Sequence, residues 1–186
     1  MSGGPKGFAP VLTDSIKSLD EAVSLTYRKA TLPAADRRYR MSASMREEIT
    51  VGEFTIRFLV EGEHSDGAVA IFEFDVPAGS RIAAAHSHDG YEETVYGVAG
   101  VLTWTVEDTL TDVGPGEALV IPRGAVHQFD NRGDVDAKAL AIVTPGILGP
   151  DYFREVGSVL AAAAGGPPDI AALVAVMKRH GLTPAP

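Results

Sequence analysis

The stretch HSHDGYEETVYGVAG, residues 86–100, places two histidines and a glutamate close together in the chain. Side chains two positions apart on a strand project from the same face, so we expect His86 and His88 on one side. The Asp89 and Gly90 pair can turn or bulge the chain, which lets Glu93 point back toward the histidines. The stretch therefore directs two imidazoles and a carboxylate toward one point.

A second stretch, GEALVIPRGAVHQFDN at residues 116–131, supplies a third histidine. Its PRG segment predicts a turn, and His127 begins the strand that returns from this turn. If the sheet closes into a barrel, His127 meets the other three side chains. Three imidazoles and one carboxylate predict a site for a divalent metal ion with positions left open for substrate or oxygen. Glu93 is also a candidate catalytic base.

Alternation of apolar and polar residues predicts a mainly β fold. Residues 54–60, 69–76 and 102–106 alternate with a period of two, as strands with one buried face do. Residues 117–122 and 137–146 add two further strands, and turn sequences rich in Gly, Pro and Asp separate the segments. Several short strands at this spacing are typical of a sandwich or a barrel.

The first stretch resembles the first sequence motif of the cupin superfamily. The matching residues are Gly79, His86, His88, Glu93 and Gly100, with one residue more than usual between Gly79 and His86. The neighbouring Glu92 fits an alternative spacing, but only Glu93 also keeps the motif's distance to Gly100. Glu93 is therefore the predicted ligand, and we expect the neighbouring glutamate to face solvent.

The second stretch resembles the second cupin motif at every spacing. The matching residues are Gly116, Pro122, Gly124, His127 and Asn131. The resemblance covers roughly residues 50–145 and implies a jelly-roll barrel, also called a double-stranded β-helix. It also implies that His86, His88, Glu93 and His127 bind a divalent metal ion inside the barrel. We interpret the motif glycines and proline as residues that make turns.

The rest of the sequence predicts three parts. Residues 1–45 form a tail with a short helix, where Ser18 and Glu21 have the spacing of a capping box. Residues 46–146 form the barrel, and residues 147–186 form two helices. The second of these helices has one apolar face, which covers either the barrel wall or a dimer partner. The sequence leaves both alternatives open.

Composition narrows the class of protein further. The net charge of −9 argues against a nucleic-acid partner, and no apolar run is long enough to span a membrane, so we expect a cytoplasmic protein. The chain has no cysteine, which excludes thiolate metal sites and a cysteine nucleophile. Nitrogen and oxygen ligands favour Fe(II) first, with Mn, Ni, Zn or Cu as alternatives. His64 and His180 are expected to have no role in the site.

The leading functional hypothesis is a metal-dependent dioxygenase that resembles the quercetinase-like small cupins and acts on an organic small molecule. Three alternatives stay open: a non-redox lyase, isomerase or cyclase, a small-ligand-binding module, and a metal that only stabilises the barrel. Phe129, Phe72 and Trp104 are candidates for the substrate pocket, although such residues more often belong to the core. By resemblance to small cupins we expect a homodimer that pairs through sheet edges.

Overall fold

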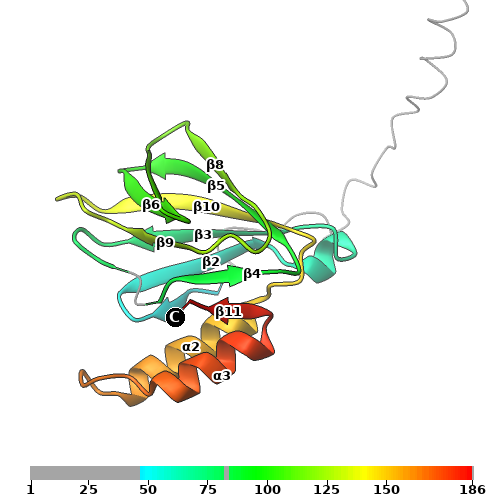
Figure 1. The fold of residues 1–186 in the computed structure, drawn as a ribbon, viewed down its shortest axis with the longest axis vertical. Coiled ribbons are helices and arrows are strands. Elements are labelled where there is room, and N and C mark those ends of the chain that lie inside the picture. Colours follow the sequence, from blue (N-terminus) through cyan, green and yellow to red (C-terminus); the bar gives the residue numbers. More distant parts are fainter. Residues whose placement is uncertain (1–46, 82–83, 186) are drawn as a thin grey trace, which may run out of the picture. The chain divides into compact units, whose positions relative to one another are not determined.

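The computed structural model describes residues 47–81 and 84–185, so the helix expected near Ser18 lies outside the described residues. Within them, two antiparallel sheets face each other across the core (Figure 1). The six-stranded sheet consists, in spatial order, of β1 (Ile49–Val51), β2 (Phe54–Val60), β3 (Ala70–Val76), β10 (Ala137–Thr144), β5 (Glu92–Ala99) and β8 (Ala118–Ile121). The five-stranded sheet consists of β11 (Leu182–Pro184), β4 (His86–His88), β9 (His127–Asp130), β6 (Leu102–Val106) and β7 (Thr109–Val113). The predicted mainly β jelly-roll fold is confirmed.

Two α-helices follow the last long strand. They are α2 (Pro150–Ala162) and α3 (Ile170–Arg179), and the connection between β2 and β3 holds a short 3₁₀ helix, η3 (Gly62–Ser65). The helices α2 and α3 lie side by side, with α2 packed against β1 and α3 against β11 (Figure 1). The Asp169 carboxylate caps α3 by accepting a hydrogen bond from the Ala172 amide. None of the helices in the described part of the chain has the length and apolarity to cross a membrane.

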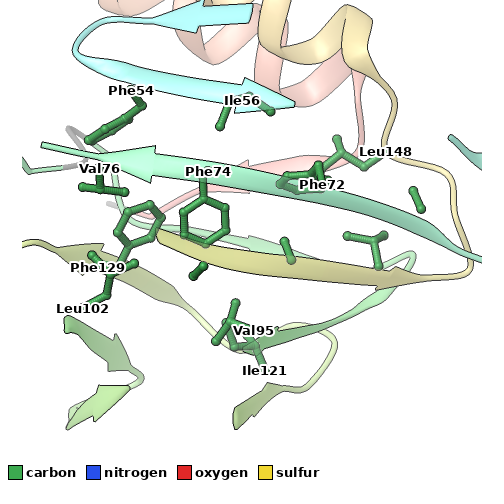
Figure 2. Packing of buried hydrophobic residues seen from close by; sticks show 14 of the residues in the cluster. Phe54, Ile56, Phe72, Phe74, Val76, Val95, Leu102, Ile121, Phe129 and Leu148 are labelled. Atoms are coloured by element: carbon green, nitrogen blue, oxygen red, sulfur yellow. The ribbon is translucent and has the colours of Figure 1, made fainter. Parts of the chain in front are cut away.

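The core lies between the two sheets because the long strands alternate as the sequence predicts. Every second side chain of β3 and β10 is buried, which gives each strand one face on the core. Phe54, Phe74 and Phe129 meet there, and the last two rings stack at a centroid distance of 5.1 Å (Figure 2). Strands far apart in the sequence thus contribute to one aromatic cluster.

The strands β7 and β11 are not predicted from the sequence. Most side chains of β7 are exposed, so this edge strand carries no alternation that a pattern could detect. Strand β11 has three residues and ends in Pro184, a residue confined to sheet edges. It pairs along β4, with Leu182 opposite His88 and Pro184 opposite His86. One edge that the expected homodimer could have covered is therefore covered by this chain itself, and the homodimer stays a prediction.

Residues of the cupin-like motifs shape the turns around these strands. The four motif glycines, at positions 79, 100, 116 and 124, all have a φ angle between 63° and 87°, a region that other residues resist. The Asn131 side chain is buried and donates hydrogen bonds to the carbonyls of Val76 and Val135, at 3.0 and 2.9 Å. It also accepts one from the Gly133 amide. Asn131 therefore ties the β9–β10 connection to the end of β3.

Candidate metal centre

The three predicted histidine ligands lie on neighbouring strands of the five-stranded sheet. His86 and His88 belong to β4, and His127 begins β9 directly opposite His86. The His127 ring centroid is 4.5 Å from that of His86 and 4.7 Å from that of His88. The alternation of β4 and the pairing of β4 with β9 thus bring three imidazoles to one point.

Backbone carbonyls set the orientation of all three rings. The Nδ1 atoms of His86, His88 and His127 lie 3.1, 3.2 and 3.0 Å from the carbonyl oxygens of residues 84, 91 and 125. A carbonyl can only accept, so each Nδ1 carries the proton in the neutral ring and each Nε2 keeps its lone pair. A ligating histidine ordinarily donates its other nitrogen to such a partner. The rings are therefore oriented to bind a cation through Nε2.

Glu93, in β5 of the other sheet, completes the cluster. Its Oε2 atom lies 3.2 Å from Nε2 of His88 and 3.5 Å from Nε2 of His127. Glu92 is exposed on the outside, as the spacing predicts. Burial alone would raise the pKa of Glu93, but the close contacts with His127 and His88 outweigh burial and hold this pKa below its usual range. The carboxylate is therefore ionised where it meets the histidines.

The pKa values of His86 and His127 are shifted in opposite directions. Burial, and then the proximity of His127, lowers the pKa of His86 to about 4, which keeps this imidazole neutral. Burial also acts to lower the pKa of His127, but its hydrogen bond with Glu93 reverses the direction and raises that pKa. Glu93 therefore shifts the pKa of His127 upward, whereas burial dominates at His86.

The donor set fits a divalent metal ion. The ligand atoms of His86, His88 and His127 all lie within 4.8 Å of one another, so these three residues could hold an ion. The Glu93 carboxylate touches two of the same Nε2 atoms and offers a negatively charged oxygen to the same centre. Imidazole nitrogens and a carboxylate suit Fe, Mn, Ni, Cu and Zn better than Mg or Ca.

The centre opens on a cavity of about 330 Å³ inside the barrel, which is large enough for a small organic molecule. The predicted pocket residues Phe72, Trp104 and Phe129 all line this cavity. So do His86, Glu93 and His127. The reacting groups of the proposed site and a largely apolar surface therefore share one cavity.

A second set of lining residues comes from the chain beyond the last barrel strand. We call this set the C-terminal wall: Leu148, Tyr152, Phe153, Val156, Leu160, Leu173, Met177 and Leu182. Apart from the Tyr152 hydroxyl, these side chains carry no hydrogen-bonding group. Leu173 and Met177 lie on the helix that is predicted to have one apolar face, but the sequence pattern places none of the eight in the site. The apolar face of each helix was the sequence feature that could have identified these residues. Such a pattern does not indicate which surface the helix covers.

Two buried polar atoms at the cavity have no hydrogen-bond partner among the described residues. They are the Tyr91 hydroxyl and the Trp104 indole nitrogen, whose side chains are each 1% exposed. The Tyr91 ring stacks on His88 at a centroid distance of 4.0 Å. A buried donor without a partner is costly, and both atoms lie beneath the cavity surface, where a molecule in the cavity does not reach them.

The two remaining histidines stand apart from the centre. His64 lies in η3, where its side chain is part of a local capping box with Glu61. His180 ends α3, and its Nε2 lies 3.0 Å from Oε1 of Glu155 in α2. Both histidines thus contact glutamates outside the metal centre, and neither histidine lines the cavity.

Comparison with known proteins places this barrel in a family. The Cupin domain model Cupin_2 matches residues 72–143. Quercetin 2,3-dioxygenase of Bacillus subtilis (strain 168) is 25% identical over 126 residues, which are 68% of this chain and 36% of that enzyme. Protein SchB of Streptomyces halstedii is 36% identical over 76 residues, 41% of this chain and 54% of that protein. The chain thus spans about a third and about half of the length of these curated relatives.

Solved structures share the same barrel. The polyketide cyclase RemF from Streptomyces resistomycificus superposes with a TM-score of 0.50 at 25% identity, over 56% of this chain and 78% of that one. A protein described as a predicted oxalate decarboxylase from Thermotoga maritima has a TM-score of 0.52 at 21% identity, over 57% and 98%. The second likeness concerns the fold alone. The domain match, the two motifs and the jelly-roll topology agree, and residues 72–143 form a cupin domain.

Proposed function

We propose that this protein is a metal-dependent enzyme that acts on an organic small molecule held in the barrel cavity. The observation that carries the proposal is the convergence of three Nε2 atoms and one carboxylate on a cavity of about 330 Å³ lined largely by apolar residues. His86, His88, Glu93 and His127 would hold the ion. Fe(II) is the first candidate, with Mn, Ni, Zn or Cu as alternatives.

The ion would supply Lewis-acid chemistry and, for a redox-active metal, electron transfer to oxygen. The protein's own groups have separate tasks. The imidazoles are held in one orientation by backbone carbonyls. Glu93 makes its two histidine contacts through Oε2, so Oε1 is the atom that would accept a proton from a substrate hydroxyl. Phe72 and Phe129 exclude water from the substrate.

Dioxygenation is the leading reaction, supported by the likeness to quercetin 2,3-dioxygenase. The test is oxygen uptake by the Fe(II)-loaded full-length protein with a panel of catechols and flavonols. We expect uptake with at least one member and a loss of about a hundredfold or more in kcat for Glu93→Gln, which keeps the shape but removes the base. Absence of uptake across the panel by fully loaded protein would contradict the dioxygenase.

A metal-dependent cyclase is the second candidate, because RemF combines the same fold with 25% identity. If this protein is a cyclase, we expect it to convert a polyphenolic or polyketide-like substrate without consuming oxygen. Mass spectrometry of anaerobic reactions separates the two reactions, since a cyclase product has the mass of the substrate or of the substrate less water. A ligand that is bound and released unchanged would instead identify a non-catalytic binding protein.

A further inference from the structure

The C-terminal wall lies outside the matched family domain, which ends at residue 143, yet it lines the same cavity as the histidines. It is also attached to β4, the strand that carries His86 and His88. Leu182 pairs with His88 in the register of β11 and β4, and the Ala185 amide donates to the Ala85 carbonyl at 2.8 Å. The wall is therefore built onto the histidine strand.

Three further contacts hold the wall in place. Phe153 of α2 packs against Phe72 of β3, with ring centroids 5.0 Å apart. Glu155 of α2 pairs with Arg179 and His180 at the end of α3, which joins the two helices. The α2 backbone approaches β1 closely at Gly157, beside the Thr50 carbonyl. These contacts make the wall a fixed surface of the cavity.

The chemistry of the wall complements that of the barrel side. Its one polar side chain, Tyr152, lines the same cavity as the rings of Tyr91 and Trp104. Burial, and then the charge of Glu93, raises the pKa of Tyr152, so this phenol stays a donor at neutral pH. Hydrogen-bond donors set in an apolar surface select an uncharged molecule that carries acceptor oxygens.

We propose that the C-terminal wall determines which substrate this protein accepts. It adapts the cavity to an uncharged molecule of two or more rings, with an acceptor oxygen that binds the Tyr152 hydroxyl. The proposal rests on the proposed function for the statement that this ligand is the substrate. The recognition itself is a property of the cavity and can be measured without a metal.

Trp104 provides the measurement, because it is the chain's single tryptophan and lines the cavity. Chelator-treated full-length protein is titrated with quercetin, a multi-ring probe, and with catechol, a one-ring probe, while Trp104 fluorescence is followed. We expect saturable quenching by quercetin in the wild type. Val156→Phe, which adds bulk to the wall, should weaken quercetin about tenfold or more and leave catechol within about twofold.

Two matched controls belong to this experiment. Val159→Phe makes the same change on the same helix at a position that does not line the cavity, and it should bind quercetin like the wild type. Tyr152→Phe keeps the ring but removes one donor, so quercetin should weaken about fivefold. Tyr96→Phe, at a position 40% exposed on β5, should have no effect.

The proposal is overturned if the wild type shows no saturable quenching by quercetin, or if Val156→Phe binds quercetin as tightly as the wild type. Equal losses in Val156→Phe and Val159→Phe would overturn it as well. Failure of the proposed function would give a different result. If the protein binds quercetin with the expected losses in the variants but converts no substrate, the proposed enzyme is contradicted and the role of the wall in recognition still holds. If Val156→Phe converts the same substrates as the wild type at the same rates, only the role of the wall in selectivity is contradicted.

Discussion

The cavity has two sides of contrasting construction. On the barrel side, β4 and β9 contribute imidazoles that backbone carbonyls orient, and β5 contributes the Glu93 carboxylate that contacts two of them. On the other side, the C-terminal wall contributes aliphatic and aromatic surface with one hydroxyl. The barrel side concentrates the groups that can bind an ion or move a proton, whereas the wall gives the space its shape.

This division has a physical consequence for how the protein can vary. A metal centre needs its donors within tenths of an ångström, so few changes on the barrel side are tolerated. An apolar wall accepts many substitutions of similar volume, each of which alters the shape of the space. Chemistry and selectivity are thus carried by different segments of one chain, and variants on either side test whether they can be separated.

The largest expected effect is on the barrel side. His86→Ala removes one imidazole, and we expect metal affinity to fall at least about a hundredfold while the protein stays folded. Metal content by inductively coupled plasma mass spectrometry, on untagged protein purified without chelator, is the measurement. His64→Ala is the matched control because His64 lies in η3 and does not line the cavity. Equal metal content in the two variants would contradict the assignment of His86.

The second prediction separates structure from chemistry within one motif. Asn131 is 1% exposed and makes three hydrogen bonds to backbone groups, so Asn131→Leu leaves two carbonyls and one amide without this partner. We expect a loss of about 2–4 kcal/mol in the free energy of unfolding, measured by urea denaturation. The folded fraction should still bind metal stoichiometrically. A stable variant without metal would instead indicate that Asn131 supports the site directly.

Much of the barrel side was predictable from the sequence because fixed spacing and strand alternation act over short distances. His86 and His88 share a face by alternation, and the PRG turn brings His127 back beside them. Choosing Glu93 over its neighbour needed the spacing of the cupin motif. The pocket role of Phe129 follows from the face that it shares with His127, and both residues line the cavity.

The C-terminal wall was not predictable, for reasons that lie in tertiary packing. The apolar face of α3 is visible as a helical pattern, but the pattern fits the barrel wall and a dimer partner equally. Tyr152 belongs to a helix whose partner, β1, lies about a hundred residues earlier in the chain. The missing hydrogen-bond partners of Tyr91 and Trp104 are likewise a property of the assembled cavity.

The smallest expected effect is a change in stability where α2 of the C-terminal wall packs against β1. Whether the change stabilises or destabilises the protein is the informative result. In an isolated helix, Gly157→Ala would stabilise by about 1 kcal/mol. In this fold, a Cβ at position 157 would lie much closer to the Thr50 carbonyl oxygen than van der Waals contact allows, so α2 must move away from β1. We therefore expect a net destabilisation of about 1–2 kcal/mol, measured by thermal unfolding, where Ser158→Ala at an exposed neighbouring position changes stability little.

The same variant shows whether the two sides of the cavity are separable. Displacing α2 moves Tyr152 and Val156 but leaves the β4–β9 pairing that orients the histidines. Gly157→Ala should therefore weaken quercetin binding and keep the wild-type metal content. If metal content fell together with quercetin binding, the attachment of β11 to β4 would couple the wall to the centre. Selectivity and metal binding would then change together, because both depend on the position of one strand.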